Sequence, residues 1–373
     1  MTAEAALDAV REAVGRVSDP ELRRPLSELD MLRDVRADGD GVVVEIALTI
    51  VGCPAADRIE RDVRTAAESA AGGAPVAVEI GVMTPAQRKA LTERLRGGAA
   101  RAMPFGEDSL TRIVAVTSGK GGVGKSTLTA NLAVALAARG LKVGLIDADV
   151  HGFSIPALLG LVVDGAAPSP TQVGDLILPP VAYGVKAISI GMFLQRGDEV
   201  VAWRGPMLHR TVQQFLTDVF FGDLDILLLD MPPGTGDVAI SVGQLLPHAD
   251  VLVVTTPQTA ASDVAVRSGR VARQTGQRVI GVVENMAAMT LPDGTVLDLF
   301  GAGGGAAVSS ALDAPLLASV PLSPALRAGG DSGAPVVSTH PDDPAATAIS
   351  ALAERIAAEP RRLAGRKLPV APV

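Results

Sequence analysis

Cysteine and aromatic residues are both scarce in this chain. Cys53 is the single cysteine, and aromatic residues make up 2% of the 373 residues. One cysteine excludes a disulfide scaffold and is typical of a reducing compartment. Because 48% of the residues are apolar but few carry rings, the core has to consist of Ala, Val, Leu and Ile. Such a core suits helices packed on a parallel sheet.

Long hydrophobic runs and excess positive charge are also missing. No apolar run approaches the roughly 20 residues that a membrane-crossing helix needs. Residues 1–10 lack the basic patch and apolar stretch of a signal peptide. The net charge of −8 argues against a nucleic-acid partner, because phosphate contacts need a clustered positive surface. We therefore expect a cytoplasmic protein without stable membrane association.

The chain divides by pattern into four parts. Residues 1–95 read as a small α+β domain, and residues 96–110, which mix Gly, Pro and charge without a period, as a linker. Residues 111–358 form the main domain, and 359–373 a flexible tail. In the small domain we expect helices at 3–17 and 53–70 and strands at 41–50 and 75–82.

Apolar strands alternate with helical stretches throughout the main domain. The expected strands are 112–118, 142–149, 185–191, 225–233, 251–257, 278–285 and 314–322. Continuous apolar strands joined by helices predict an α/β fold, with a parallel sheet covered by helices on both faces.

A glycine-rich loop follows the first of these strands. Its sequence, GKGGVGKS at 119–126, satisfies the P-loop pattern G-x-x-x-x-G-K-[ST] between a strand and a helix-forming run. Backbone N–H groups of such a loop surround phosphates, Lys125 reaches the β and γ oxygens, and Ser126 offers a hydroxyl to Mg²⁺. The candidate ATP-binding residues are Gly119, Lys120, Gly121, Gly122, Val123, Gly124, Lys125, Ser126 and Thr127.

Carboxylates follow two other strands. Asp147 and Asp149 come after the second strand, and Asp230 follows four apolar residues, with Asp237 in the next loop. Ligands bind beyond the carboxyl ends of parallel strands, so we expect Asp230 to hold Mg²⁺ through water or through Ser126. Asp147 and Asp237 are equally well explained as turn or cap residues.

A second lysine in the loop, Lys120, is unusual in a chain with six lysines. With it the loop, KGGVGKS, resembles the deviant Walker A class of P-loop ATPases, which includes MinD, ParA and nitrogenase iron-protein relatives. The resemblance implies a homodimer in which Lys120 reaches the partner's nucleotide, where a cation stabilises the transition state. It also implies that Asp149 orients the attacking water and that Asn285 reads adenine. From the residues alone, without the resemblance, Lys120 is explained as a solvated loop lysine and Asn285 as a turn former.

Further blocks narrow the resemblance to the Mrp/ApbC family of proposed iron–sulfur cluster carriers. These blocks are DADVHGFSIP, WRGPM, DILLLDMPPGTGD, TTPQ and GVVENM. The N-terminal SDPEL and LTIVGCP resemble the MIP18-like domain fused to many members. The resemblance implies slow, Mg²⁺-dependent ATP hydrolysis by a homodimer that delivers clusters to apoproteins or assists their assembly.

One departure from that family concerns the cluster ligands. Many members carry a Cys-x-x-Cys pair after the asparagine block, but here Leu291 and Gly294 stand about where those thiols would be. A cubane cluster ordinarily takes four thiolates, whereas a homodimer of this chain offers two copies of Cys53. Cys53 stands at the start of a predicted helix and is a candidate iron–sulfur ligand, although a buried structural cysteine explains it equally well.

Two alternative functions remain open from the sequence. One is a positioning ATPase of the MinD or ParA type, which would need a membrane-binding tail or a basic DNA-binding face. The other is a nucleotide-binding module without turnover, against which the aspartates at the strand ends argue.

Overall fold

The computed structural model describes residues 3–50, 55–95, 104–106, 109–193 and 205–359. It divides into two compact units. Unit 1 comprises Met1–Ala102, Pro170–Val181 and Asp218–Gly222, and unit 2 comprises the remaining residues. Cys53, most of the predicted linker and nearly all of the predicted tail lie outside the described residues.

Unit 1 is built around a three-stranded sheet with the order β1-β2-β3. Its strands are β1 (Leu32–Asp38), β2 (Gly41–Leu48) and β3 (Val76–Val82). β1 and β2 are antiparallel, and β2 and β3 are parallel. The unit also contains α1 (Ala3–Gly15), α2 (Ala56–Ala70), α3 (Pro85–Leu95), β6 (Thr171–Val173) and β7 (Leu176–Leu178).

Alternating apolar residues explain the core of unit 1. Val44 and Ile46 of β2 are fully buried together with Ile59 and Val63 of α2, so one face of the sheet meets the apolar stripe of the helix. The predicted helices at 3–17 and 53–70 correspond to α1 and α2. β1 and α3 were not predicted, because their residues are too polar to give a clear period.

Unit 2 contains an eight-stranded sheet with the order β15-β12-β11-β4-β10-β5-β9-β8. Every pair from β15 to β9 is parallel. The strands are β4 (Arg112–Ser118), β5 (Val143–Asp147), β8 (Val181–Ala182), β9 (Val185–Ser189), β10 (Ile226–Asp230), β11 (Asp250–Thr255), β12 (Arg278–Ala287) and β15 (Leu316–Pro321). All seven predicted strands are present, so the α/β prediction is confirmed. β5 and β10 are shorter than predicted, because the chain leaves the sheet at Asp147 and Asp230.

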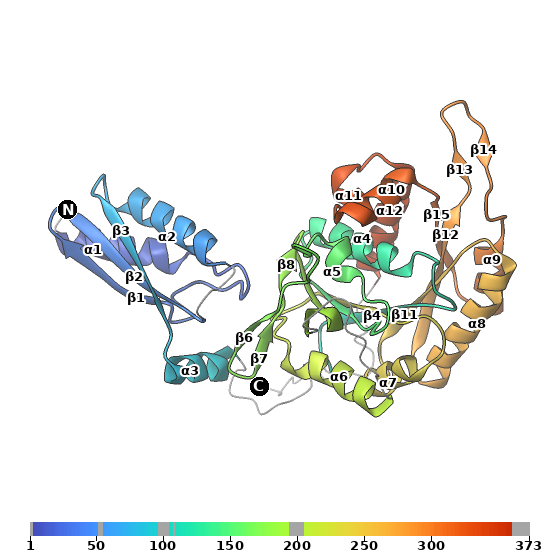
Figure 1. The fold of residues 1–373 in the computed structure, drawn as a ribbon, viewed down its shortest axis with the longest axis horizontal. Helices are drawn as coiled ribbons and strands as arrows, with labels where there is room; N and C mark the ends of the chain where they lie inside the picture. The colour runs from blue at the N-terminus through green and yellow to red at the C-terminus, as the bar shows by residue number, and fades with distance from the viewer. Residues whose placement is uncertain (1–2, 51–54, 96–103, 107–108, 194–204, 360–373) are drawn as a thin grey trace, which may run out of the picture. The chain divides into compact units, whose positions relative to one another are not determined.

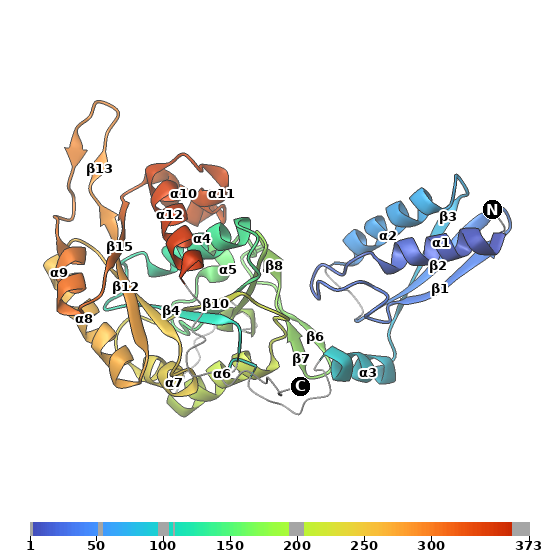
Figure 2. The same ribbon diagram turned by 180° about the vertical axis from the view of Figure 1, so that it is seen from behind.

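Helices cover both faces of this sheet (Figures 1 and 2). One face carries α4 (Lys125–Ala138), α5 (Ile155–Leu158), α10 (Pro324–Ser332), α11 (Val336–Thr339) and α12 (Pro344–Ala358). The other face carries α6 (Gly205–Asp218), α7 (Asp237–Leu245), α8 (Thr259–Gln274) and α9 (Gly304–Ala311). A short 3-10 helix, η1 (Ile190–Phe193), follows β9. No described helix has both the length and the hydropathy to cross a membrane.

The strands are apolar on both faces because both faces are buried. Val114 and Val116 of β4 belong to the core cluster under α4 and α12. Ile113 and Ala115, which alternate with them along the strand, are buried on the opposite side. This arrangement accounts for the continuous apolar runs in the sequence. It also places the carboxyl ends of β4, β5 and β10 at one edge of the sheet, where the glycine-rich loop begins.

At the opposite edge, a cluster of ion pairs holds the end of α12 against the strands. Asp250, at the start of β11, pairs with Arg112 at 3.0 Å and with Arg278 at 2.8 Å. Both arginines also reach Glu359 at 3.3 Å, and Arg112 donates to the carbonyl oxygen of Ile356. The side chains of Arg112 and Asp250 are each 11% exposed, so the charges depend on one another for compensation.

We predict that Asp250→Ala lowers the free energy of unfolding by about 3 kcal/mol, because Arg112 loses its shortest carboxylate contact in a buried setting. The exposed Arg327–Asp331 pair, with side chains 73% and 68% exposed, provides the control, and Asp331→Ala should cost below about 0.5 kcal/mol. Urea denaturation measures both variants. Equal losses in the two variants would contradict the prediction.

Candidate functional site

The glycine-rich loop connects β4 to α4. Most of its glycines are needed because neighbouring atoms leave no room for a Cβ atom or because the backbone has a positive φ angle. A Cβ atom on Gly119 would lie 2.3 Å from the backbone nitrogen of Ala265 in α8. Gly124 has φ +77°, and a Cβ there would lie 2.3 Å from Nδ2 of Asn285. Gly122 also has a positive φ of +78°. The loop therefore has the conformation that only glycine adopts without strain.

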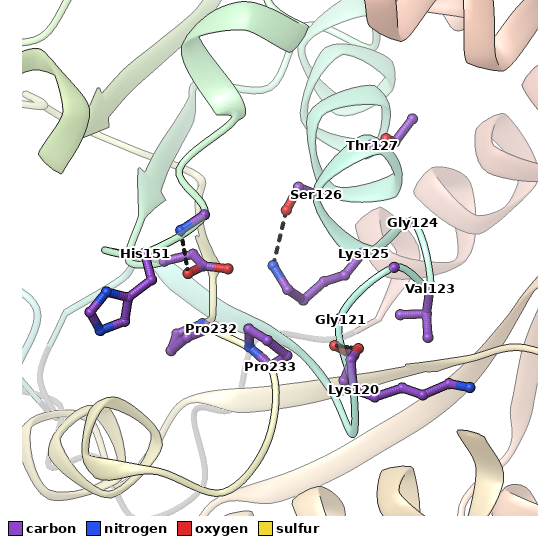
Figure 3. A pocket seen from close by; sticks show the side chains of 14 residues that line it. Lys120, Gly121, Val123, Gly124, Lys125, Ser126, Thr127, His151, Pro232 and Pro233 are labelled. Carbon is purple, nitrogen blue, oxygen red and sulfur yellow. Dashed lines mark hydrogen bonds between the residues drawn. The ribbon is translucent and has the colours of Figure 1, made fainter. Parts of the chain in front are cut away.

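A cavity of about 560 Å³ lies inside this loop (Figure 3). It is lined by Ser118, Lys120, Gly121, Gly122, Val123, Gly124, Lys125, Ser126, Thr127, Asp149, His151, Gly152, Pro232 and Pro233. Nearly all of the predicted loop residues line the cavity, and so does Asp149. Its position at the amino end of α4 provides backbone N–H groups and the positive end of the helix dipole for a phosphate.

Lys125 and Ser126, which line the cavity, both contact the buried Asp230. The Lys125 Nζ atom lies 2.7 Å from Oδ1 of Asp230, and these side chains are 6% and 0% exposed. Ser126 Oγ donates to Oδ2 of Asp230 at 2.5 Å, and Thr129 Oγ1 donates to Oδ1 at 2.9 Å. A hydroxyl group and a carboxylate on adjacent elements are the hard oxygen donors that Mg²⁺ takes from proteins. These residues therefore fit the predicted magnesium site.

Asp147 stands beside Asp230 in the register of β5 and β10 and is fully buried. Burial, and next the neighbouring Asp230 carboxylate, raise the pKa of Asp147 to about 8. Hydrogen bonds from Ser189 Oγ and the Ile155 amide oppose this rise. Two neighbouring buried carboxylates repel each other when both are ionised. A proton on Asp147 therefore stabilises the pair.

This raised pKa predicts a pH dependence of stability. An aspartate in the unfolded chain titrates near about 3.9, so between that pH and the folded value the native protein binds more protons than the unfolded chain. The free energy of unfolding of the nucleotide-free protein should therefore fall as the pH rises from about 5 to about 8. Asp147→Asn, which has no titratable proton, should flatten that fall. Urea denaturation at several pH values measures it, and parallel curves for the two proteins would contradict the prediction.

Lys120 occupies a different position from Lys125. Its side chain points away from Lys125 (Figure 3), and its Nζ atom donates to Oε1 of Gln258 at 3.2 Å at the surface. Lys120 therefore does not join the Asp230 cluster of its own chain. This geometry leaves its ammonium group beside the cavity and directed outward.

Of the remaining predicted residues, Asn285 contacts the glycine-rich loop, whereas Asp237 lies away from the cavity. Asn285, at 4% exposure, donates through Nδ2 to the carbonyl oxygen of Val123 at 2.9 Å, so it supports the loop from β12. Asp237 does not line this cavity. It is exposed in the first turn of α7, where a carboxylate is favoured by the helix dipole, and it lines a separate hollow with His209 of α6.

Sequence reasoning had not identified three polar residues around the cluster. Thr129 bonds Asp230 from α4, Ser189 bonds Asp147 from β9, and Gln258 holds Lys120. Thr129 could have been found, since it lies four residues after Lys125 and therefore on the same face of the helix. Ser189 is distant in sequence and carries no pattern of its own. Gln258 ends the TTPQ block, but that block does not indicate a contact with Lys120.

A metal-binding cluster is not evident among the described residues. No group of three or more His, Cys, Asp or Glu side chains in the described ranges could hold a metal ion, and Cys53 is outside these ranges. Leu291 and Gly294, the two positions that the sequence comparison set against a Cys-x-x-Cys pair, lie in the turn between β13 (Met289–Thr290) and β14 (Val296–Leu297). Figure 1 shows this hairpin projecting from the end of β12.

The chain is similar to known proteins along most of its length. The model of the "NUBPL iron-transfer P-loop NTPase" family matches residues 109–357, and the model of "Iron-sulfur cluster assembly protein" matches residues 7–80. The iron-sulfur cluster carrier protein of Mycobacterium tuberculosis is 52% identical over 373 residues, covering 98% of this chain and 96% of that protein. The carrier protein of Bacillus subtilis is 38% identical over 319 residues, covering 84% and 88%.

Among solved structures, a nucleotide-binding protein from Archaeoglobus fulgidus in complex with ADP is 35% identical, with a TM-score of 0.47, covering 60% of this chain and 86% of that chain. Full-length similarity to the carrier proteins and the match of one family model to more than half of the residues agree with the P-loop and parallel sheet described above. This chain belongs to the family of NUBPL iron-transfer P-loop NTPases.

Proposed function

We propose that this protein is an ATPase that carries iron–sulfur clusters to apoproteins or assists their assembly, and that it works as a homodimer with ATP at the shared interface. The observation that carries the ATPase part is the contact of Lys125, Ser126 and Asp230 at the base of the glycine-rich loop. The carrier part is supported by the full-length similarity to iron-sulfur cluster carrier proteins.

Binding of ATP would replace the ion pair between Lys125 and Asp230 with contacts to phosphate and Mg²⁺. Without nucleotide, the Lys125 ammonium group is neutralised by Asp230. A triphosphate in the loop offers Lys125 new anionic partners, while Asp230 and Ser126 would hold Mg²⁺, which neutralises developing phosphate charge when it is bound. Asp149, which lines the same cavity, would orient the attacking water. We expect slow hydrolysis, far below about 1 per second.

The outward direction of Lys120 supports the dimer. The Lys120 ammonium group donates to Gln258 and does not join Lys125 at Asp230, and in a face-to-face dimer it would reach the partner's triphosphate. Adenine recognition by Asn285 is also part of the proposal. One amide N–H of Asn285 bonds Val123, and its Oδ1 can still accept from the base.

The iron–sulfur cluster is the cargo in this proposal. A homodimer provides two copies of Cys53, so a cubane cluster would need further thiolates. A client apoprotein or a small thiol would provide them. Cys53 is therefore proposed as a ligand shared with the receiving protein rather than as part of a closed site.

Anaerobic reconstitution tests the carrier role. The wild type and Cys53→Ala are incubated with ferrous iron, sulfide and glutathione, and the bound iron and visible absorbance are measured. Wild-type protein should bind iron that Cys53→Ala does not, and should pass it to an apo-ferredoxin. The absence of bound iron in both proteins would refute the carrier role while leaving the ATPase intact. Equal iron in both would refute Cys53 as the ligand.

No feature of the described residues favours a positioning ATPase of the MinD or ParA type over this proposal. Co-sedimentation with anionic liposomes and with DNA in the presence of ATP tests that alternative. Cytoplasmic location remains a prediction from the sequence.

A further inference from the structure

The buried carboxyl group of Asp147 takes no part in the nucleotide contacts proposed above. It is the last residue of β5, is fully buried, and does not line the nucleotide cavity. Burying a carboxyl group costs free energy unless hydrogen bonds compensate it. The partners of Asp147 therefore indicate what the group does.

Both oxygens of Asp147 are bonded to the chain that follows it. Oδ1 accepts from the backbone N–H of Asp149 at 3.2 Å. Oδ2 accepts from the backbone N–H groups of Ser154 at 3.1 Å and Ile155 at 3.2 Å, and from Ser189 Oγ at 3.0 Å. One carboxyl group thus joins the beginning of the loop 148–154 to its end, and anchors both to β9.

The loop 148–154 carries residues that line the cavity proposed for the nucleotide. Asp149, His151 and Gly152 line the cavity, and the Gly152 N–H donates to Oδ1 of Asp149 at 3.0 Å. A Cβ atom on Gly152 would lie 3.3 Å from Oδ2 of Asp149, so the backbone packs closely around this carboxylate. The direction of the Asp149 side chain therefore depends on the closure of the loop.

We propose that Asp147 is a positioning residue for ATP hydrolysis: it closes the loop 148–154 so that Asp149 is held in place to orient the attacking water. This inference rests on the proposed ATPase function and adds to it a residue that does not contact the nucleotide. Nucleotide binding depends on the glycine-rich loop, Lys125 and Ser126, which Asp147 does not hold. Asp147 should therefore affect kcat and leave nucleotide affinity nearly unchanged.

Asp147→Asn is the main test. The amide keeps one acceptor oxygen for Ser154, Ile155 and Ser189, but presents an NH₂ group to the Asp149 N–H, so two donors face each other. We expect kcat to fall about 10- to 100-fold, as displacement of a catalytic group by about 1 Å does, while the affinity for a non-hydrolysable ATP analogue stays within about twofold. Ser189→Ala, a milder change remote from the loop in sequence, should lower kcat by a smaller factor.

A double-mutant cycle separates positioning from a general structural role. If Asp147 acts through Asp149, then Asp147→Asn should slow hydrolysis in the wild type but add nothing in an Asp149→Asn background. Independent, multiplicative losses would overturn the proposal. So would a shift in the Mg²⁺ concentration for half-maximal activity with unchanged kcat at saturation, because the effect would then run through Asp230.

The outcomes also separate this inference from the proposed function. If the wild type and Lys125→Ala show the same phosphate release, the ATPase function fails. If the wild type hydrolyses ATP, Lys125→Ala does not, and Asp147→Asn keeps its full kcat, then only the positioning role fails. Should Asp147→Asn fold poorly, Ser189→Ala and its cycle with Asp149→Asn decide the question in the same way.

Discussion

Lys125→Ala is expected to weaken ATP binding by at least about 30-fold, since truncating one member of a buried charge pair costs about 2 kcal/mol or more. The substitution removes the cation that faces the phosphates. It also leaves Asp230, whose side chain is 0% exposed, without its neutralising partner at 2.7 Å. A carboxylate left unpaired at this position repels the triphosphate that the loop is built to hold.

Fluorescence titration with a labelled ATP analogue measures this effect. Lys142→Ala is the matched control, because Lys142 is exposed and precedes β5 at the opposite edge of the sheet. Its affinity should equal that of the wild type. A Lys125→Ala protein that remains folded and binds ATP like the wild type would refute the assignment of the site.

Lys120→Ala is expected to separate hydrolysis from binding. Nucleotide affinity should stay within a few-fold, because Lys120 contacts Gln258 rather than the cavity cluster. Hydrolysis should fall about 100-fold or more, as it does when a cation provided in trans is lost from a P-loop enzyme. Phosphate release and light scattering with ATP and Mg²⁺ measure turnover and dimer formation. Unchanged turnover in a protein that stays monomeric would refute the dimer.

Mixing two inactive variants tests whether Lys120 acts on the partner's nucleotide. Lys120→Ala keeps its own phosphate loop, and Lys125→Ala keeps the lysine that crosses to the partner. Half of the dimers in an equal mixture carry one complete site, so activity should recover to about a quarter of the wild-type value for a symmetric dimer. No recovery, in a mixture shown to form mixed dimers, would place the action of Lys120 within its own chain.

The sequence predicted the fold well because its strands are buried on both faces. Continuous apolar runs such as 226–229 leave little alternative to a parallel sheet covered by helices. Polar elements were missed: β1 reads LRDVRAD, with a single buried residue and no apolar period. β6 and β7 were missed for a different reason, because each is only three residues long.

In the candidate site too, the sequence predicted residues that follow a local pattern but not the contacts between distant segments. The glycine pattern identified the loop, Lys125 and Ser126, because phosphate binding imposes a fixed local spacing. The sequence could place Asp147, Asp149 and Asp230 only at strand ends. The order of the sheet, with β5 beside β10, brought Asp147 against Asp230 and left Asp149 on the loop that faces the cavity.

Local spacing by itself determined the glycine-rich loop, its two lysines and the carboxylates at the strand ends, because each depends on residues adjacent in the chain. Only the tertiary structure decided that Lys125 pairs with Asp230, that Lys120 points outward to Gln258, and that Asp147 fastens a loop to β9. These contacts join segments up to 138 residues apart, and their partners are chosen by strand order and burial. A buried carboxyl group accepts whichever donors the fold brings to it, and no spacing in the sequence specifies those donors.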